Sequence, residues 1–366
     1  MRVESTTLVV RPPANAAGIG VQYARILPLH GQPGVLLATY EENRVPDQLC
    51  GFWILRSADD GRTWEKIAHV REEVSGLSPI WNPTLFELPR ACGDLPAGTI
   101  LLLGTSIDED NSIIQLYASR DGGYTWSWLS SVVQGGNYNH GNRVGHGVWE
   151  GFLILLDDNT LVCYYSDESQ AEMYSQKIMY KTTRDGYHWS DPVTVIASSD
   201  PTHRPGMPVV TRLEDGSYFM VVEVVGLEGN PIHYKRSPDG LDWGDTTSLG
   251  TLLESVDGKT MGSAPFCGYS PVNHTLVVSA SFMRTGESKT GSEYFISHDQ
   301  GHTWHTTGHP LPHPANGYAY SNSFAFSEDG TKLYAVNNVP DANHPGKAEI
   351  RLAIVSTDAM SEEEIG

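Results

Sequence analysis

The stretch SRDGGYTW, residues 119–126, decides the fold because the chain nearly repeats it. SADDGRTW (57–64) and SHDQGHTW (297–304) share its template Ser-x-Asp-x-Gly-x-Thr-Trp, while TRDGYHW (183–189) and SPDGLDW (237–243) are one residue shorter. The five tryptophans that end these stretches are 62, 63, 54 and 61 residues apart. A period near sixty in a 366-residue chain predicts six units. The sixth copy, AEIRLAIVSTD, keeps a strand and an Asp but lacks the tryptophan.

Each unit also carries the same order of short strands. A hairpin-like pair such as FLILL/TLVCYYS precedes a third strand that leads into the Asp turn, and a fourth strand such as WEKIAHV follows it. Four antiparallel strands repeated six times predict an all-β, six-bladed β-propeller that spans residues 1–366 as one domain. A stacked solenoid is the alternative, but four-stranded units of this length favour closure into a ring.

Composition excludes several classes of partner. The formal charge of −20 argues against nucleic acid, which needs a concentrated basic face. No apolar run is long enough to cross a bilayer, so no membrane partner is expected, and the start MRVESTTLVV lacks the regions of a signal peptide. The four cysteines have no metal-like spacing. The sequon Asn273-His274-Thr275 weakly supports secretion, and we expect an extracellular monomer.

The repeated aspartates are expected to serve folding, because Asp can bond turn amides and the tryptophan can pack between strands. Catalytic groups are therefore sought at the mouth of the ring, where the innermost strands begin. The residues at those starts are polar and aromatic, as a sugar site requires: Tyr23, Arg25, Trp81, Asn82, Trp149, Glu150, Arg204, Ser263 and the segment 318–322.

Two carboxylates stand out in apolar surroundings. Glu150 lies between Trp149 and an inner strand, and Glu223 interrupts the apolar run YFMVVEVVG. Two carboxylates whose surroundings separate their protonation states are the machinery of most glycosidases. The alternative is that both are structural partners of Arg25 or Arg204. Of the other acids, Asp167 and Glu168 are candidate substrate binders or orienters, Glu41 and Glu42 resemble rim residues, and Asp108 and Asp110 suit a solvated loop.

These segments resemble a known family. The Asp turns look like the Asp boxes of sialidase-like propellers, and the segments VVQGGNYNHGNRVGHGVWEGFLILLDDNTLVCYYSDE and THRPGMPVVTRLEDGSYFMVVEVVG are similar to glycoside hydrolase family 93, the exo-α-1,5-L-arabinanases. The similarity continues through NPTLFELP and GSAPFCGYSPV to YSNSFAF, so it covers nearly the whole chain.

The resemblance implies retaining hydrolysis of linear arabinan from its non-reducing end with release of arabinobiose, without a metal or organic cofactor. It implies that Glu150 is the nucleophile, Glu223 the acid/base, Tyr320 a group near the reaction centre and Arg204 a sugar contact. Arg25, Trp81, Asn82, Trp149, Tyr165, Asp167 and Asn322 complete the candidate substrate-binding set. Two positions depart from the family pattern: Gly151 replaces a Pro after the Trp-Glu pair, and Asn322 replaces an Arg, which puts product length in question.

Two other functions fit parts of the sequence. A sialidase would use a tyrosine nucleophile and an arginine cluster, for which Arg25, Arg204 and Arg284 are the candidates. A binding propeller without catalysis would accommodate the departures at Gly151 and Asn322. For a glycosidase, a carboxyl separation of about 5–5.5 Å between Glu150 and Glu223 would indicate retention, and about 6.5–9.5 Å inversion.

Overall fold

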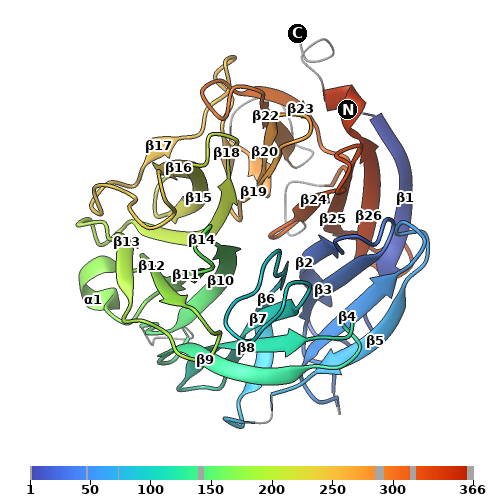
Figure 1. The fold of residues 1–366 in the computed structure, drawn as a ribbon, viewed down its shortest axis with the longest axis horizontal. Helices are drawn as coiled ribbons and strands as arrows, with labels where there is room; N and C mark the ends of the chain where they lie inside the picture. Colours follow the sequence, from blue (N-terminus) through green and yellow to red (C-terminus); the bar gives the residue numbers. More distant parts are fainter. Residues whose placement is uncertain are drawn as a thin grey trace.

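The computed structural model describes residues 2–46, 48–72, 74–138, 144–284, 292–313 and 319–360. Six four-stranded antiparallel sheets stand around a common centre as the blades of a propeller (Figure 1). The ring confirms the predicted architecture and excludes the solenoid.

In every blade the predicted hairpin supplies the two inner strands. The innermost strands are β2 (Val21–Pro28), β6 (Ser78–Glu87), β10 (Val148–Leu155), β14 (Arg204–Arg212), β19 (Phe266–Ser270) and β24 (Ser323–Phe326). The second strands are β3 (Leu36–Glu42), β7 (Ile100–Ile107), β11 (Leu161–Asp167), β15 (Tyr218–Val225), β20 (Thr275–Ser279) and β25 (Lys332–Pro340).

The outer half of each blade holds two more strands. The third strands are β4 (Phe52–Ser57), β8 (Ser112–Ser119), β12 (Lys177–Thr183), β16 (Ile232–Ser237), β22 (Glu293–Ser297) and β26 (Ala348–Ser356). The fourth strands of blades 1 to 5 are β5 (Glu65–Val70), β9 (Ser127–Gly135), β13 (Val193–Ile196), β17 (Thr251–Leu252) and β23 (His305–Gly308). Short elements complete the described chain: β18 (Met261–Gly262), β21 (Phe282–Met283), α1 (Ala171–Tyr174) and the 3-10 helix η1 (Thr357–Met360).

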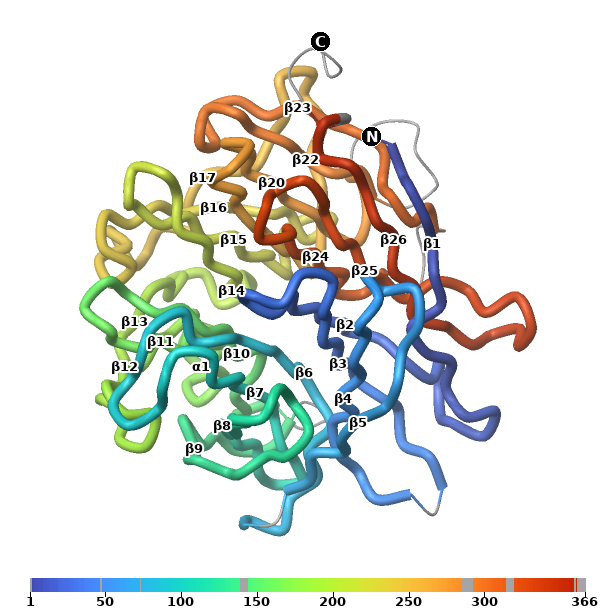
Figure 2. The backbone as a smooth tube through the Cα atoms, turned by 45° about the vertical axis from the view of Figure 1, so that its right-hand side comes forward, coloured from blue at the N-terminus to red at the C-terminus, as the bar shows by residue number. Residues whose placement is uncertain are grey.

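The ring closes through its first strand. In blade 6 the order is β1-β26-β25-β24, so β1 (Arg2–Val10) pairs antiparallel with the last strand and supplies the outermost position (Figure 2). This closure was not predicted, because the opening residues were considered only as a possible signal. Pairing the two ends of the chain in one blade ties the first blade to the last and covers an edge of β26.

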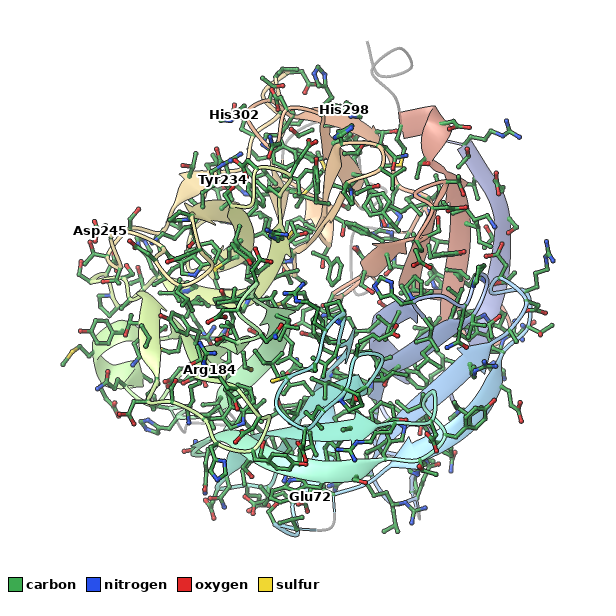
Figure 3. The ribbon with its side chains drawn as sticks, in the orientation of Figure 1. Glu72, Arg184, Tyr234, Asp245, His298 and His302 are labelled. Atoms are coloured by element: carbon green, nitrogen blue, oxygen red, sulfur yellow. The ribbon has the colours of Figure 1, made fainter. Side chains whose placement is uncertain are left out.

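The Asp turns have the predicted folding role. In the first turn the Asp59 carboxylate accepts bonds from the Thr63 N–H (2.9 Å) and hydroxyl (2.7 Å), while the Gly61 N–H donates to Ser57 Oγ at 2.9 Å. The 119–126 and 297–304 turns repeat these bonds. His298 and His302 place the fifth turn at the outer part of the ring (Figure 3).

The tryptophans of these turns pack between blades rather than within one. Six hydrophobic clusters fill the six blade interfaces, and each turn tryptophan joins the cluster between its own blade and the preceding one. At the interface of blades 5 and 6 the buried Met360 of η1 occupies this role. Each copy of the turn therefore stabilises a junction of the ring, and the sixth copy does so with methionine.

Candidate active site

A cavity of about 270 Å³ opens at the mouth of the ring, where the innermost strands begin. The residues that line it come from blades 1, 2, 3, 4 and 6: Gln22, Glu41, Trp81, Asn82, Tyr138, Trp149, Glu150, Glu168, Arg204 and Tyr320. Strands one and three of a blade run away from the mouth, so the Asp turns that follow the third strands lie at the opposite end of the ring.

A β-bulge repeated from blade to blade directs side chains into this cavity. In β2, β6, β10 and β14 the pairing with the second strand skips near the mouth, and the residues at the skip are Tyr23, Asn82, Glu150 and Met207. Their φ angles are 52°, 56°, 62° and 55°, in the left-handed region that non-glycine residues rarely adopt. Such a bulge bends the strand and changes where its side chain points, and it stores backbone strain at a functional site.

Glu150 is held rigidly at one of these bulges. Its Oε2 accepts hydrogen bonds from the Ser166 hydroxyl at 2.6 Å and from the Met207 N–H at 2.7 Å, and the residue is 9% exposed. Burial and the neighbouring Glu223 carboxylate raise the pKa of Glu150 to about 7, against the opposing charge of Arg204 and the two hydrogen bonds. At neutral pH Glu150 is therefore present in both its protonated and its ionised form.

Glu223 lies on β15 in the next blade and is 5% exposed. Its Oε2 accepts bonds from Ser263 Oγ at 3.0 Å and from the Ala264 N–H at 2.8 Å. Gly206 lies between the two acids: a Cβ placed on it would be 3.4 Å from Glu150 Oε2 and 3.6 Å from Glu223 Oε1. Those two oxygens are therefore at most 7.0 Å apart, a bound that admits the separation of retaining enzymes and the lower end of the inverting range.

The cation beside the pair is bound to a different acid. Arg204 donates to Glu168 Oε1 through Nε (3.0 Å) and Nη2 (2.7 Å), and Trp149 Nε1 donates to Glu168 Oε2 at 3.0 Å. In the described part of the chain the ion pair of Arg204 is thus with Glu168, not with either candidate catalytic acid. Glu168 orients both Arg204 and Trp149 at the cavity wall.

Aromatic rings form the side of the cavity contributed by blades 2 and 3. Trp81 packs against Trp149 with ring centroids 5.5 Å apart and meets Tyr138 edge-on at 5.4 Å. Tyr320 contributes another ring, 6.3 Å from Tyr23. Desolvation by the surrounding protein, together with the charges of Glu150, Glu223 and Glu41, raises the pKa of Tyr320 well above 10, so its phenol stays protonated. Rings with polar tips beside acids suit a sugar, which has both apolar faces and hydroxyl groups.

Some candidate residues lie behind the cavity rather than on its wall. Arg25 is 4% exposed, donates to Ser321 O (2.9 Å) and Oγ (2.8 Å), and joins blade 1 to blade 6. Tyr165 lies in the hydrophobic core between blades 2 and 3, and Asp167 accepts from the Ser169 N–H at 2.7 Å. The Asn322 amide is buried and donates to Ala280 O at 3.1 Å.

The three arginines considered for a sialidase do not share a site. Arg25 binds Ser321, Arg204 binds Glu168, and Arg284 donates to Glu228 O and Thr260 Oγ1. Residue 318 of the expected mouth segment lies outside the described residues.

Three wall residues were missed by the sequence reasoning: Gln22, Glu41 and Tyr138. The interpretation of Glu41 as a rim residue was wrong, because it is 3% exposed and faces the cavity. Aligning the hairpins by register would have found it, since Glu41 occupies in blade 1 the position that Glu223 occupies in blade 4. For Gln22 and Tyr138 the sequence held no comparable signal.

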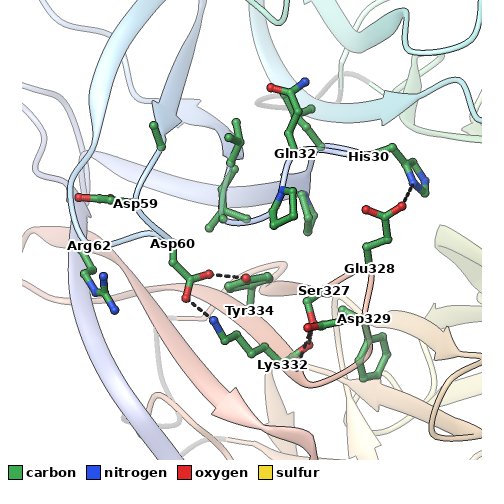
Figure 4. Close-up of a pocket in the computed structure, with 18 residues that line it drawn as sticks. His30, Gln32, Asp59, Asp60, Arg62, Ser327, Glu328, Asp329, Lys332 and Tyr334 are labelled. Atoms are coloured by element: carbon green, nitrogen blue, oxygen red, sulfur yellow. Dashed lines mark hydrogen bonds and ion pairs between the residues drawn. The ribbon is translucent and has the colours of Figure 1, made fainter.

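A larger cavity, of about 710 Å³, lies between the turns of blades 1 and 6 at the far end of the ring (Figure 4). Its acids are occupied by the fold: Asp59 closes its own turn, Asp60 binds Lys332 and Tyr334, and Glu328 accepts from the Gly31 N–H. Size alone therefore does not identify the active site. The smaller cavity has Glu150 on its wall, with Glu223 on the other side of Gly206, and it has the aromatic wall and the strained backbone.

Within the described residues, no group of three or more His, Cys, Asp or Glu side chains is arranged to hold a metal ion, and no helix is long and apolar enough to span a membrane. All four cysteines are free thiols.

Comparison with known proteins gave matches among solved structures. No family model and no curated protein matches the chain. The GH93 α-L-arabinofuranosidase of Fusarium graminearum, in complex with arabinobiose, is 30% identical with a TM-score of 0.86 over 98% of this chain and 99% of its own. The α-L-arabinanase of Penicillium chrysogenum, also with arabinobiose, is 29% identical with a TM-score of 0.84 over the same shares. A Hadza microbial sialidase is 16% identical with a TM-score of 0.62, over 93% of this chain and 66% of its own, and shares the fold alone.

A six-bladed ring whose mouth holds two buried glutamates against an aromatic wall defines a glycoside hydrolase of the propeller class. The match in sequence and structure over nearly the whole chain makes the assignment more specific. The chain belongs to glycoside hydrolase family 93.

Proposed function

We propose that this protein is an exo-acting hydrolase that degrades linear α-1,5-L-arabinan from the non-reducing end and releases arabinobiose with retention of configuration. The observation that carries the proposal is the pair Glu150 and Glu223 on either side of Gly206, with Glu150 on the cavity wall, in a chain that belongs to family 93. The α-L-arabinofuranosidase and the α-L-arabinanase described above were both solved with arabinobiose bound. The cavity of about 270 Å³ is at the small end of ligand pockets, which suits a chain end rather than a chain that runs through.

In the proposed mechanism Glu150 Oε1 or Oε2 attacks the anomeric carbon while Glu223 gives its proton to the leaving oxygen. The glycosyl-enzyme is then hydrolysed by a water that Glu223 deprotonates, and the proton returns to Glu223. Burial and Glu223 raise the pKa of Glu150 to about 7, and the charge of Arg204 and the bonds from Ser166 and Met207 limit this rise, so the ionised form that a nucleophile requires is populated at neutral pH and above. Arg204, Trp81, Asn82 and Trp149 are proposed to contact sugar, and Tyr320 to lie beside the reacting carbon.

We also propose that residues 1–366 act as one catalytic domain, as a monomer, outside the cell. A polymeric substrate supports the location, because a polysaccharide does not cross a bilayer. The six blade interfaces form a continuous ring of cores, which supports a single cooperative unit.

The test is incubation with linear arabinan and, separately, with a sialoside, followed by chromatography of the released sugar. Release of arabinobiose from arabinan, and its loss in Glu223→Gln by about 10²- to 10⁴-fold in kcat, is expected for removal of a general acid. The circular dichroism of the variant should match the wild type. Free sialic acid, or no sugar from either substrate, would reject the proposal, and full activity in Glu223→Gln would remove this residue from the mechanism.

A further inference from the structure

Another carboxyl group on the cavity wall, that of Glu41, repeats the position of Glu223 in its blade. The ladder pairs Gln22 with Glu41 in blade 1 and Gly206 with Glu223 in blade 4, in both cases just before the bulge. Each acid accepts the N–H of a left-handed residue in the next blade: Asn82 donates to Glu41 Oε1 at 2.7 Å, as Ala264 donates to Glu223. Glu41 and Glu223 are thus equivalent in local geometry.

Joining two blades does not require a carboxyl group at this position. In blade 2 the equivalent residue is Thr105, whose side chain carries no charge, and the N–H of the left-handed Glu150 is accepted by Asn82 Oδ1 at 3.4 Å instead. Burying an acid is more costly than burying a hydroxyl, and Glu41 is only 3% exposed. The blade junction alone therefore does not explain why residue 41 carries a carboxyl group.

Two amides hold this carboxyl at the cavity wall. Gln22 Nε2 donates to Glu41 Oε2 at 2.9 Å, and Asn82 Nδ2 lies 3.4 Å from Oε1. Gln22, Glu41 and Asn82 all line the cavity. Burial raises the pKa of Glu41 to about 7, although Asn82, Gln22 and Arg25 oppose the shift. At neutral pH the group is present in both protonation states, so it can accept a hydrogen bond from a sugar hydroxyl or donate one to it.

The order of the blades places this cluster on the side of the cavity away from the leaving group. Glu41 belongs to blade 1, Asn82 to blade 2, Glu150 to blade 3 and Glu223 to blade 4. In a six-bladed ring, blades 1 and 4 face each other across the mouth. If Glu223 protonates the leaving oxygen and Glu150 attacks the anomeric carbon, the sugars that stay on the enzyme extend toward blades 1 and 2.

We infer that Glu41, supported by Gln22 and Asn82, binds hydroxyl groups of the non-reducing-end sugar units and so holds the released disaccharide. This inference rests on the proposed function and names a substrate contact for it. Loss of a hydrogen bond to a charged group lowers binding by about 10- to 100-fold.

The test compares Glu41→Gln and Gln22→Met with Glu42→Gln, a matched control. Glu42 is the next residue on β3 and accepts bonds from Gln48 and Trp53 instead of facing the cavity. The measurements are the Kd of arabinobiose by calorimetry, kcat and KM on linear arabinan, and Tm. We expect Glu41→Gln to raise the Kd of arabinobiose about 10- to 100-fold and to lower kcat/KM chiefly through KM. Gln22→Met should also raise the Kd of arabinobiose and lower kcat/KM, and Glu42→Gln should leave both quantities unchanged.

The outcomes separate the two proposals. If the wild type is active but Glu41→Gln and Gln22→Met bind arabinobiose as tightly as the wild type, the proposed role of Glu41 is wrong and the proposed function stands. If the two variants have a lower Tm but unchanged affinity for arabinobiose, Glu41 serves folding, and its proposed role is again wrong. If Glu41→Gln does not fold, Gln22→Met decides by the same measurement. A wild type that neither hydrolyses arabinan nor binds arabinobiose overturns the proposed function, and this inference with it.

Discussion

Gly206 keeps the space between the two glutamates open. A methyl group there would lie 2.7 Å from Gln176 Nε2, in addition to its contacts with the oxygens of Glu150 and Glu223. Since Gln176 Nε2 donates to Pro205 O at 2.7 Å and is buried, it has little freedom to move away. The absence of a side chain at position 206 is therefore part of the proposed catalytic geometry.

Gly206→Ala should lower kcat/KM on linear arabinan by about 10- to 100-fold, because displacement of a catalytic group by about 1 Å has effects of this size. Steady-state kinetics checks the loss, and Gly308→Ala is the control, since a methyl group at Gly308 meets nothing within 4 Å. Equal activity in the two variants would contradict the role given to Gly206.

At the level of single residues, the sequence pointed to the two candidate catalytic acids but did not reveal which other residues line the cavity. Glu150 and Glu223 stood out because acids in apolar strands are costly, and the structure brings both to the mouth. Glu41 was missed because the pair Glu41-Glu42 at the end of a strand looks like a solvated edge, and only the register reveals that they face opposite ways. At position 151, where Gly departs from the family pattern, the structure shows a close packing that sequence could not reveal: a Cβ on Gly151 would lie 2.3 Å from Leu103 Cδ2 of the neighbouring blade.

At the level of elements, each Asp turn places its tryptophan in the hydrophobic core between two blades. Trp243 is 4% exposed and packs in the core between blades 3 and 4, with its ring 5.8 Å from that of Tyr164. Trp243→Ala should lower the free energy of unfolding by about 3–5 kcal/mol, as expected for a buried aromatic side chain. Urea denaturation provides the measurement.

Trp128→Ala on β9 is the matched control, because this tryptophan is 40% exposed and its loss should cost far less. Comparable destabilisation by the two substitutions would show that the turn tryptophan does not stabilise the core between two blades.

The strand pattern could be predicted because the period repeats, and the six hairpins and six third strands lie where the sequence places them. Closure of the ring by β1 could not be predicted in the same way. The partner of β1 is almost the whole chain away, at β26, and no local motif encodes so distant a pairing. The replacement of tryptophan by Met360 in the sixth turn was likewise hidden, because the template is lost there.

At the level of the whole molecule, the ring separates folding from catalysis: the Asp turns stabilise one end and the acid pair occupies the other. The pKa values of the turn aspartates and of the buried glutamates at the mouth are shifted in opposite directions. Hydrogen bonds from the Thr63 side chain and backbone and from Ser57 lower the pKa of Asp59 to about 2, and the fifth turn lowers that of Asp299 to about 2 in spite of desolvation. Burial raises the pKa values of Glu41 and Glu150 to about 7.

These shifts predict a maximum of stability between about pH 4 and 5. The stability contributed by the turn aspartates is present above their unfolded pKa of 3.8 and is lost as the pH falls toward 2. The buried glutamates bind protons more tightly in the folded state, so their contribution is lost as the pH rises from 4.5 toward 7. Urea denaturation at a series of pH values checks both limbs.

In that series Asp59→Asn should reduce the loss of stability on going from pH 4 to pH 2. Glu150→Gln should reduce the loss of stability as the pH rises above 4.5. A free energy of unfolding that is flat between pH 2 and 7 would contradict the protonation states assigned here.

The measurement that tests the central claim most directly is proton NMR of the first product released from linear arabinan, before mutarotation. If Glu150 forms a glycosyl-enzyme that Glu223 helps to hydrolyse, the first product is arabinobiose in the α configuration. Initial formation of the β anomer would contradict the double displacement, and the absence of any released sugar would contradict the proposed activity itself.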